Sequence, residues 1–540
     1  MPCNIIVLAG GDVSTQLTTF GGYTSYGIYP VRGKPFVLWT LDCAKINIDD
    51  RCIVVVEKHN TQLINALTNY IKKYNITLVT TDAGCSILSS LRCGLAHCNK
   101  SFATKIILGD TAICDPVSPN IGDTIFTSPN FLSSVRWCLV QKDNNDYITH
   151  YDDKLENIDI TNKEAIVGIY ILSDTKLLIN SNDIALQNNA NRMSTVLGFY
   201  QEVRPLKSKT VTQWVDFGSV HSLVKASHML YNVRHFNQIK VHDNGIIEKS
   251  STNKRKLQKE ESWYKSLPLE LQVMTPRIFA SKELDDKYHL MLEIYGYQNL
   301  SEIFVYGSRE IEDWYYIIKR LISTHQNICA FKCDVKKDDT FALYHTKTYE
   351  RIKLLLDDAN LQDITTGDVI MINGIQCNNI PSIRGQISEI TTHLINTCHQ
   401  FTIVHGDLCF SNILFDSMNY CFKLIDPRGD DLYGDPRYDI AKLRHSIVGL
   451  YDFIVLDQYT LTEIESNSYE LNIFADKTKN DHISTYFDNT IASQGFALNE
   501  IKMIEALLFL TMIPLHADDI QRQKAFYLIA IKKFNELLYA

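Results

Sequence analysis

Polar residues cluster in one short stretch near the C-terminal end of the chain, and they lie between apolar runs. His405, Gly406 and Asp407 follow one apolar run, and Asn412 precedes another. A turn then leads into a third run, which ends at Asp426. Short apolar runs separated by turn residues are typical of buried strands. We therefore expect a rigid hairpin that brings three polar side chains to one edge.

These three side chains are of the kinds that phosphoryl transfer requires. The reaction needs a carboxylate to accept the proton of the acceptor hydroxyl, and oxygen ligands to hold Mg²⁺ against the phosphates. We predict that Asp407 is the base and that Asn412 and Asp426 are the metal ligands. We predict that His405 is buried and fixes the loop by hydrogen bonding, without a chemical role.

The order and spacing of these residues match a known pattern. Asp407 and Asn412 are spaced like the Asp and Asn of the protein-kinase catalytic loop, and Asp426 stands where the DFG aspartate would. Gly406 replaces the kinase arginine, Asp-Pro-Arg replaces DFG, and Gly-Asp-Pro-Arg-Tyr-Asp-Ile-Ala follows at 434–441. These departures resemble the aminoglycoside phosphotransferase and choline kinase family, whose members phosphorylate small-molecule hydroxyls. The resemblance implies an α+β bilobal protein-kinase-like domain that uses ATP. The alternative is a hairpin with carboxylates in its turns, which would have to produce these motifs by chance.

Length and composition exclude several other classes. A chain of 540 residues is too long for one ordinary domain. Its net charge of -9 gives no field that attracts nucleic acid or an anionic membrane, so neither is an expected partner. The 14 cysteines lack metal-binding spacing, and no signal peptide or membrane-spanning run is found. We expect a cytoplasmic protein without disulfides, and the sequence leaves its oligomeric state open.

The N-terminal part alternates apolar, β-rich runs with amphipathic stretches of helical length. Strands are expected at 5–9, 53–56, 76–79 and 106–108, and helices at 35–46, 60–74 and 86–98. The alternation predicts an α/β domain with a doubly wound parallel sheet, whose site lies at the carboxyl ends of the strands. Gly10 and Gly11 follow the first strand, and Asp110 follows the fourth. A glycine pair there lets backbone N–H groups approach phosphate, although it is as often a tight turn.

Six short motifs follow one another in this part. They are Leu8-Ala9-Gly10-Gly11, Pro30-Val31-Arg32-Gly33-Lys34-Pro35, Ser90-Leu91-Arg92-Cys93-Gly94-Leu95, Leu108-Gly109-Asp110, Gly168-Ile169-Tyr170 and Trp214-Val215-Asp216-Phe217-Gly218. Their order resembles nucleotidyltransferases of the sugar-1-phosphate and phosphocholine type. The resemblance implies that Asp110 and Asp216 hold Mg²⁺ and that Gly10, Gly11 and Lys34 bind the nucleotide.

One departure concerns the cations of this resemblance. The family usually places an arginine soon after the glycine pair and a lysine before the Gly-Lys-Pro segment, where they grip the triphosphate. Here no Lys or Arg occurs between Gly11 and Arg32. A group aimed at developing negative charge typically contributes several kcal/mol to transition-state stabilisation. The activity of this domain is therefore an open question.

We expect a domain boundary near Val233, which divides the chain into a nucleotidyltransferase-like domain at 1–233 and a kinase domain at 234–540. A helix is expected at 220–233. The Asn-Gly pair at 244–245 lies between two β-like runs and predicts a hairpin at the start of the second domain. Helical patterns dominate from Asp439 to the C-terminus.

Lys249, on the second strand of that hairpin, is the expected cation for the ATP phosphates, with Glu260 or Glu261 on the next helix as its ion-pair partner. The alternative is a solvated basic stretch from Lys249 to Lys259. Glu293 ends a further strand, and the hinge that follows is expected to bind adenine through its backbone.

These expectations combine into a bifunctional enzyme. One half would phosphorylate a sugar or amino alcohol with ATP, and the other would transfer a nucleotidyl group from a second NTP, CTP among the candidates, to a phosphomonoester. Consecutive steps of this kind activate building blocks for surface polysaccharides or lipids. The first rival keeps the kinase and makes the N-terminal half a non-catalytic binding or scaffold module. A more distant rival makes both halves degenerate.

Overall fold

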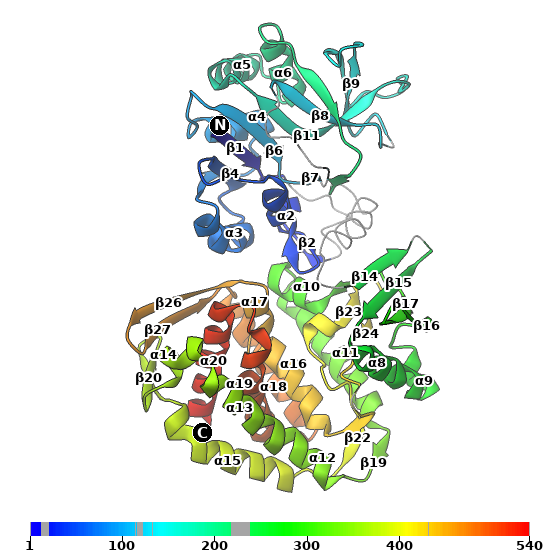
Figure 1. Ribbon diagram of the computed structural model, residues 1–540, viewed down its shortest axis with the longest axis vertical. Helices are drawn as coiled ribbons and strands as arrows, with labels where there is room; N and C mark the ends of the chain where they lie inside the picture. Colours follow the sequence, from blue (N-terminus) through cyan, green and yellow to red (C-terminus); the bar gives the residue numbers. More distant parts are fainter. Residues whose placement is uncertain are drawn as a thin grey trace. The chain divides into compact units, whose positions relative to one another are not determined.

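The structure is a computed structural model that describes residues 2–11, 21–113, 115, 122–131, 133–217, 238–242, 244–429 and 431–538. The chain divides into two compact units, Met1–Leu230 and Tyr231–Ala540 (Figure 1). The boundary expected near Val233 and the helix expected at 220–233 lie outside the described residues. Within the described ranges, no helix is both long enough and apolar enough to cross a membrane.

The first unit is built on a mixed sheet whose central strands are parallel. They are β1 (Cys3–Leu8), β4 (Arg51–Glu57), β5 (Ile76–Thr81) and β6 (Ala103–Leu108), in the order β5-β4-β1-β6. The predicted parallel sheet is thus confirmed for these strands. Antiparallel pairing begins at β11 (Glu164–Leu172), which lies between β6 and β9 (Cys138–Lys142) and was not foreseen. The outer strands are β8 (Thr124–Ser128), β10 (Ile148–Asp153) and β12 (Lys207–Thr210).

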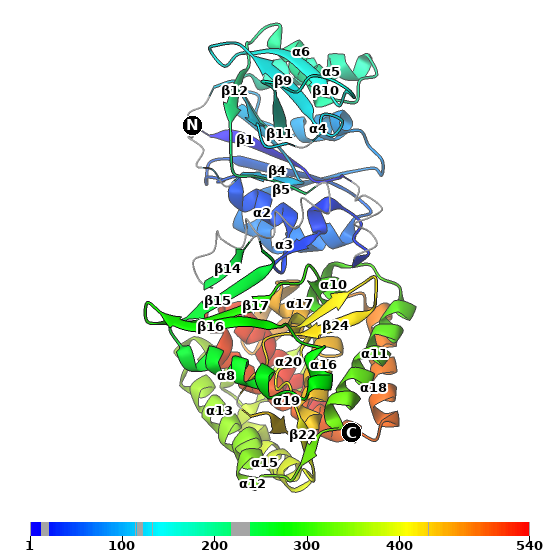
Figure 2. The same ribbon diagram turned by 90° about the vertical axis from the view of Figure 1, so that its right-hand side faces the viewer.

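Helices cover both faces of this sheet, as a doubly wound fold requires. Helices α2 (Phe36–Cys43) and α3 (Thr61–Lys73) lie on one face, whereas α4 (Ile87–Leu95), α5 (Thr175–Gln187) and α6 (Met193–Gln201) lie on the other (Figures 1 and 2). Alternate residues of a strand point to opposite faces. Ile6 and Leu8 of β1 accordingly share a buried cluster with Leu88 of α4, while the intervening Val7 is fully buried on the other side.

The second unit begins with an antiparallel sheet of order β14-β15-β17-β16. Its strands are β14 (Gln238–His242), β15 (Ile246–Ser251), β16 (Ile278–Leu284) and β17 (Lys287–Glu293). The predicted hairpin joins β14 to β15, and Gly245 in its turn has a φ of +81°, a conformation that glycine adopts without strain. Helix α8 (Lys254–Ser266) packs against β15 and β17.

Helices form most of the rest of the second unit and enclose its core. They include α11 (Ile311–Cys329), α13 (Lys347–Asp357), α15 (Ile380–Asn396), α16 (Pro436–Ile447), α18 (Lys477–Ser493), α19 (Leu498–Met512) and α20 (Ile520–Leu538). Apolar residues of α16, α19 and α20 belong to one continuous buried cluster. A four-stranded sheet was not foreseen. It consists of β20 (Val369–Ile372), β21 (Ile375–Asn378), β26 (Tyr459–Glu465) and β27 (Ser468–Ile473).

Candidate active sites

The polar stretch of the second unit forms a tight loop and hairpin. Strand β22 (Phe401–Ile403) precedes the loop, and β23 (Ile413–Asp416) pairs antiparallel with β24 (Cys421–Leu424) after it. His405 is buried, donates from Nε2 to the Ile425 carbonyl at 3.0 Å and accepts the Asp407 N–H at Nδ1 at 3.3 Å. Burial lowers the pKa of His405, which suits a neutral ring with these two bonds. These contacts make His405 a residue that holds the loop.

The loop is also held from helix α16. The Asp439 carboxylate accepts the backbone N–H groups of His405 and Gly406 at 2.7 and 2.9 Å. Gly406 has a φ of +76°, and a Cβ at this position would lie 2.8 Å from the Arg428 Cβ. A side chain would therefore be strained and would clash, which explains why glycine stands here.

Asp407 projects from this loop beside a lysine. Its Oδ1 lies 2.8 Å from Lys442 Nζ, and its Oδ2 accepts a hydrogen bond from Asn412 Nδ2 at 3.1 Å. Burial alone would raise the pKa of Asp407, but the Lys442 charge and hydrogen bond outweigh it and lower the pKa. The carboxylate is therefore ionised at neutral pH, as a proton acceptor must be. Lys442 lies on α16, the helix that begins within the Gly-Asp-Pro motif. The sequence analysis assigned no role to this lysine.

Asn412 and Asp426 lie on neighbouring segments of the hairpin. The Ile425 N–H donates to the Asn412 carbonyl at 3.0 Å. The backbone of Asn412 is therefore bonded to the residue that directly precedes Asp426. Asp426 adopts a φ of +54°, a left-handed conformation that aspartate tolerates better than most residues. Asn412 uses its Nδ2 to bind Asp407, which leaves the amide oxygen for another partner.

Lys249 reaches this hairpin from β15, in the antiparallel sheet at the start of the second unit. Its Nζ lies 2.7 Å from Glu260 Oε1 and also forms an ion pair with Asp426. Of the two predicted partners, Glu260 is therefore the one in contact, whereas Glu261 pairs with Lys265. Burial alone would lower the pKa of Lys249, but the charges of Asp426 and Glu260 raise it. Lys249 itself is thus held by two carboxylates, whereas Arg255 and Lys256 of the same stretch are exposed.

The oxygen donors here suit Mg²⁺ in number and kind. No group of three or more His, Cys, Asp or Glu in the described part of the chain is arranged to hold a metal ion. Magnesium, however, is usually held by one or two carboxylates together with substrate phosphates and waters. The Asn412 amide oxygen and the Asp426 carboxylate meet that requirement, and the ion pair with Lys249 shows that Asp426 already attracts a cation.

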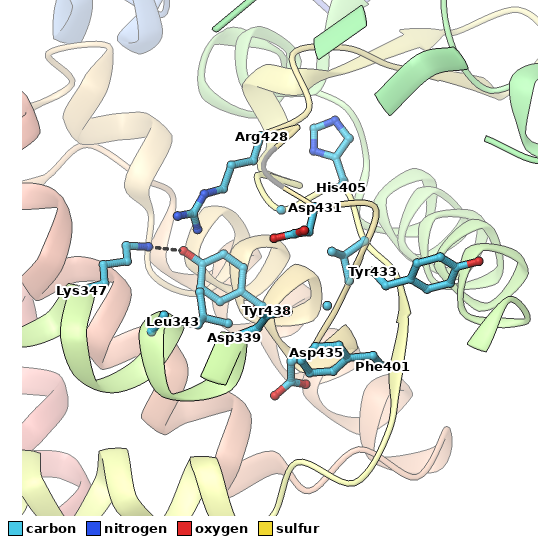
Figure 3. Close-up of a pocket in the computed structure, with 14 residues that line it drawn as sticks. Asp339, Leu343, Lys347, Phe401, His405, Arg428, Asp431, Tyr433, Asp435 and Tyr438 are labelled. Atoms are coloured by element: carbon cyan, nitrogen blue, oxygen red, sulfur yellow. Dashed lines mark hydrogen bonds between the residues drawn. The ribbon is translucent and has the colours of Figure 1, made fainter. Parts of the chain in front are cut away.

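A pocket adjoins the loop on the side of Gly406. It encloses about 220 Å³, and its lining includes His405, Gly406, Arg428, Lys347 and Tyr438 (Figure 3). The pocket is smaller than the roughly 300–1,000 Å³ that is typical of drug-sized ligands. It offers a small molecule access to the loop that carries Asp407.

In the first unit, Asp110 and Asp216 are brought together by two short strands. Strand β7 (Thr111–Ile113) pairs with β13 (Trp214–Asp216), Asp216 stands opposite Thr111, and the Phe217 N–H donates to the Asp110 carbonyl at 3.0 Å. Burial and then the neighbouring Asp216 charge raise the pKa of Asp110 to about 6. Two carboxylates that repel each other in this way are suited to share a divalent cation.

Both aspartates line a cavity of about 470 Å³, with Gly168 on its wall. Three cations that the sequence analysis did not single out also line it: Arg136, Lys154 and Arg192. Arg136 binds Asp216 at 3.1 Å. They come from the region between the fourth central strand and α6, where no motif marks them. The cavity thus has positive charge although no Lys or Arg occurs between Gly11 and Arg32.

Lys34 is placed differently from the prediction. Its side chain is buried, forms an ion pair with Asp42 and lies 4.7 Å from the centroid of the Trp39 ring. It does not line the cavity that contains Asp110 and Asp216. In this structure its ammonium group is engaged by Asp42 of α2, and its role in binding nucleotide stays a prediction.

The other predicted positions lie at ends of strands. Gly10 and Gly11 follow the carboxyl end of β1, and the Tyr26 N–H donates to the Gly11 carbonyl at 3.3 Å. Glu293 is the last residue of β17, and its Oε2 accepts a hydrogen bond from the Tyr295 hydroxyl at 2.6 Å.

Comparisons with known proteins find similar folds at low sequence identity. No family model and no curated protein matches the chain. Solved structures similar to it include the inositol-1-phosphate CTP transferase from T. maritima, with 15% identity, 44% of this chain and 97% of that chain covered, and a TM-score of 0.37. HddC from Yersinia pseudotuberculosis has 16% identity, 42% and 99% coverage, and a TM-score of 0.31. A thermostable mutant of the aminoglycoside phosphotransferase APH(4)-Ia has 10% identity, 56% and 89% coverage, and a TM-score of 0.36.

Proposed function

We propose that the chain is a bifunctional enzyme whose second unit is an ATP-dependent kinase of small hydroxyl compounds. The observation that carries the proposal is the ion pair between Lys249 and Asp426, which are 177 positions apart in sequence, with Glu260 at 2.7 Å from the same ammonium group. A kinase needs a cation for the ATP phosphates beside the metal-binding carboxylate. The sequence motifs alone do not require that Lys249 and Asp426 lie in contact.

In the proposed reaction each residue has a distinct task. Asp407, kept ionised by Lys442, accepts the proton of the acceptor hydroxyl. The hydroxyl oxygen forms a bond to the γ-phosphorus, the bond from that phosphorus to the β,γ-bridging oxygen breaks, and ADP leaves. Lys249 orients the phosphates, and Asn412 and Asp426 would hold Mg²⁺. When bound, Mg²⁺ neutralises negative charge on the phosphates.

We propose that the first unit transfers a nucleotidyl group from a second NTP to a phosphomonoester, with release of pyrophosphate. Asp110 and Asp216 would hold Mg²⁺ at the cavity, and Gly10 and Gly11 would approach the phosphates through their N–H groups. The three cations of the cavity wall, Arg136, Lys154 and Arg192, favour this activity because they supply charge for anionic substrates. CTP is one candidate for the NTP.

Two such reactions have a chemical connection. A kinase makes a phosphomonoester, and a nucleotidyltransferase converts a phosphomonoester into an NDP-activated group. Together they would activate a sugar or amino alcohol for a surface polysaccharide or lipid, and their use of NTPs favours the cytoplasm. The alternative is an active kinase fused to a non-catalytic binding or scaffold module, and it is favoured by the absence of Lys and Arg between Gly11 and Arg32.

A direct assay tests the proposal. The intact protein is incubated with Mg²⁺, ATP and a panel of sugars and amino alcohols, and phosphorylated products are detected by mass spectrometry. A second panel pairs each common NTP with sugar-1-phosphates and phosphorylated amino alcohols, and pyrophosphate is measured. Kinase products without pyrophosphate from any pairing would support the alternative. Absence of Mg²⁺-dependent ATP binding to the second unit would contradict the kinase.

We also propose the domain limits 1–233 and 234–540. The separation of the chain into compact units between Leu230 and Tyr231 supports a boundary in this part of the sequence. Each unit has its own buried cluster, so a cut near Val233 is expected to give two pieces that fold separately. Residues 234–540 should keep the kinase activity of the full chain within about twofold. Aggregation of both pieces would argue for a shared core.

A further inference from the structure

The pocket beside Gly406 has a basic wall. Figure 3 shows the Lys347 ammonium group and the Arg428 guanidinium group directed toward the Tyr438 hydroxyl. Lys347 Nζ lies 2.7 Å from that hydroxyl and 5.1 Å from the centroid of the ring. Tyr438 itself is buried, whereas Lys347 is half-buried at the start of α13. Two cations therefore converge on one phenol inside the pocket.

The partner of Lys347 inside the pocket is an uncharged phenol. In the ranges that the structure describes, Lys347 forms no ion pair, and the Tyr438 hydroxyl is its hydrogen-bond partner. Burial lowers the pKa of Lys347, as expected for an ammonium group with an uncharged partner. For Tyr438 the effect of burial is outweighed by Lys347, Lys442 and Arg428, and its pKa is lowered as well. The Tyr438 shift indicates a positive potential at this wall, beside the two cations that Figure 3 shows there.

The carboxylates of the pocket are engaged elsewhere or exposed. Asp435 accepts hydrogen bonds from the Arg437 guanidinium group and from Tyr344 at 2.8 Å. Asp339 lies 3.6 Å from Lys336, and Asp431 is exposed. None of these carboxylates forms an ion pair with Lys347, so a ligand with negative charge would meet an uncompensated cation there.

This wall is close to the proposed base. Tyr438 and Lys442 are one turn apart on α16 and therefore lie on the same face of the helix. Lys442 Nζ is 2.8 Å from Asp407 Oδ1. The backbone positions of Tyr438 and Lys442 are thus about one helical turn, roughly 5 Å along the axis, apart, which places the basic wall on the side of α16 that carries the lysine in contact with the proposed base.

We propose that Lys347 and Tyr438 form an oxyanion-binding subsite of the acceptor pocket, so that the acceptor is a small hydroxyl compound that carries a phosphate or carboxylate group. This inference rests on the proposed kinase function and narrows its substrate class. A cationic amino alcohol does not fit the basic wall, because its ammonium group would be placed against Lys347.

The first experiment compares matched acceptors with the intact protein. Four forms of one polyol are offered with Mg²⁺ and ATP: the neutral compound, its phosphate monoester, its carboxylate and its amine, and ADP is measured. We expect kcat/KM to be at least about 10-fold higher for an anionic form than for the neutral one, and lowest for the amine. The phosphate and carboxylate arms identify the anion.

The outcomes separate the two proposals. Preferred turnover of the neutral compound or the amine would overturn the anion subsite and leave the kinase standing. Lack of Mg·ATP binding together with lack of turnover would overturn the kinase itself.

The second experiment removes the positive charge of Lys347. Lys347→Met is expected to raise KM for the anionic acceptor by roughly 10- to 100-fold while KM for ATP is unchanged. Lys353→Met on the same helix removes an exposed lysine and is the matched control. Lys347→Arg should restore part of the affinity. Equal losses for the neutral and anionic acceptors in Lys347→Met would show a structural role and overturn the proposal.

A milder variant guards against loss of folding. Tyr438→Phe keeps the buried ring and removes only the hydroxyl that binds Lys347. It is expected to raise KM for the anionic acceptor several-fold, with little change for the neutral one. An unchanged KM for the anionic acceptor in this variant would remove Tyr438 from the subsite.

Discussion

The two units place acidic residues at their candidate sites in opposite electrostatic settings. In the second unit each acidic group has its own lysine: Asp407 lies beside Lys442, and Asp426 lies beside Lys249. In the first unit the charge of Asp216 raises the pKa of Asp110, and Arg136 forms an ion pair with Asp216. The pKa of Asp407 is lowered as a result, whereas that of Asp110 is raised to about 6.

The difference suggests which unit has the greater need of a bound cation. In the second unit Asp407 and Asp426 each form an ion pair with a lysine of the protein itself. The first unit leaves two carboxylates whose repulsion is only partly relieved, and a divalent cation would relieve it further. We therefore expect the first unit to respond more strongly to Mg²⁺ than the second in the absence of nucleotide.

The largest expected effect is at Asp407. Asp407→Asn removes the proposed base and should lower kcat for phosphoryl transfer by roughly 10²- to 10⁴-fold. Mg·ATP binding should be largely retained, because the side chain faces Lys442 and Asn412 rather than Lys249. Steady-state kinetics and calorimetric ATP titration measure the two quantities. Asp481→Asn, an exposed residue of α18, is the control. Near-wild-type turnover in Asp407→Asn would remove it as the base.

The second prediction tests whether the first unit is catalytic. Asp110→Ala and Asp216→Ala should each lower pyrophosphate release by about 10²-fold or more, while kinase activity remains unchanged. Glu156→Gln neutralises an exposed carboxylate of the same unit and should alter neither. Pyrophosphate release and ADP formation are measured on the same preparations. Loss of both activities in an aspartate variant would indicate unfolding or coupling instead of a separate site.

The third prediction concerns the lysine and aspartate that meet in the second unit. Asp426→Asn should weaken Mg·ATP binding by roughly 10- to 100-fold, because a charged ligand is replaced by a neutral one. Lys249→Met should weaken ATP binding also when Mg²⁺ is omitted, since its proposed contact is with phosphate. Calorimetric titrations with and without Mg²⁺ separate the two roles. A wild-type binding curve for Asp426→Asn would exclude it as the metal ligand.

The sequence predicted the folds of both units well because their signals are local. Alternating apolar runs marked the central strands of the first unit, and the Asn-Gly pair marked the hairpin of β14 and β15, whose turn contains Gly245. Antiparallel strands such as β11 and β26 were missed. Their pairing depends on distant partners, and a short apolar run does not reveal which partner it will join.

The candidate sites were predictable only where spacing is fixed by chemistry. Asp407, Asn412 and Asp426 stand at motif positions, and the structure brings them into one hairpin. Lys442, Lys347 and Arg136 were missed because isolated basic residues on helices or loops carry no pattern. Lys34 shows a further limit of the sequence: it stands in a motif, but the motif does not reveal the ion pair that its ammonium group forms with Asp42.

The smallest expected effect is on the stability of the first unit. It directly tests the contrast between the carboxylates of the first unit and the lysine-paired carboxylates of the second. The folded-state pKa of Asp110 is raised from 3.8 to about 6. A raised pKa means that the folded state binds the proton more tightly, so its contribution to stability is fully present below pH 4 and is lost as pH rises through about 6. Above that pH the ionised carboxylate destabilises the first unit. Asp110→Asn should therefore stabilise it by about 1–2 kcal/mol at pH 8 and have little effect at pH 4.

Hydrogen exchange of the amides in β6 and β7 measures this effect locally, without interference from the second unit. Mg²⁺ should slow exchange in the wild type at pH 8 and should do so less in Asp110→Asn, because a ligand that binds only the folded state stabilises it more when its affinity is higher. Glu156→Gln should show the wild-type response. If Asp110→Asn were destabilising at pH 8 and Mg²⁺ had no effect on the wild type, the carboxylates of the first unit would not repel each other across a shared cation position, and the contrast with the lysine-paired acids of the second unit would fail.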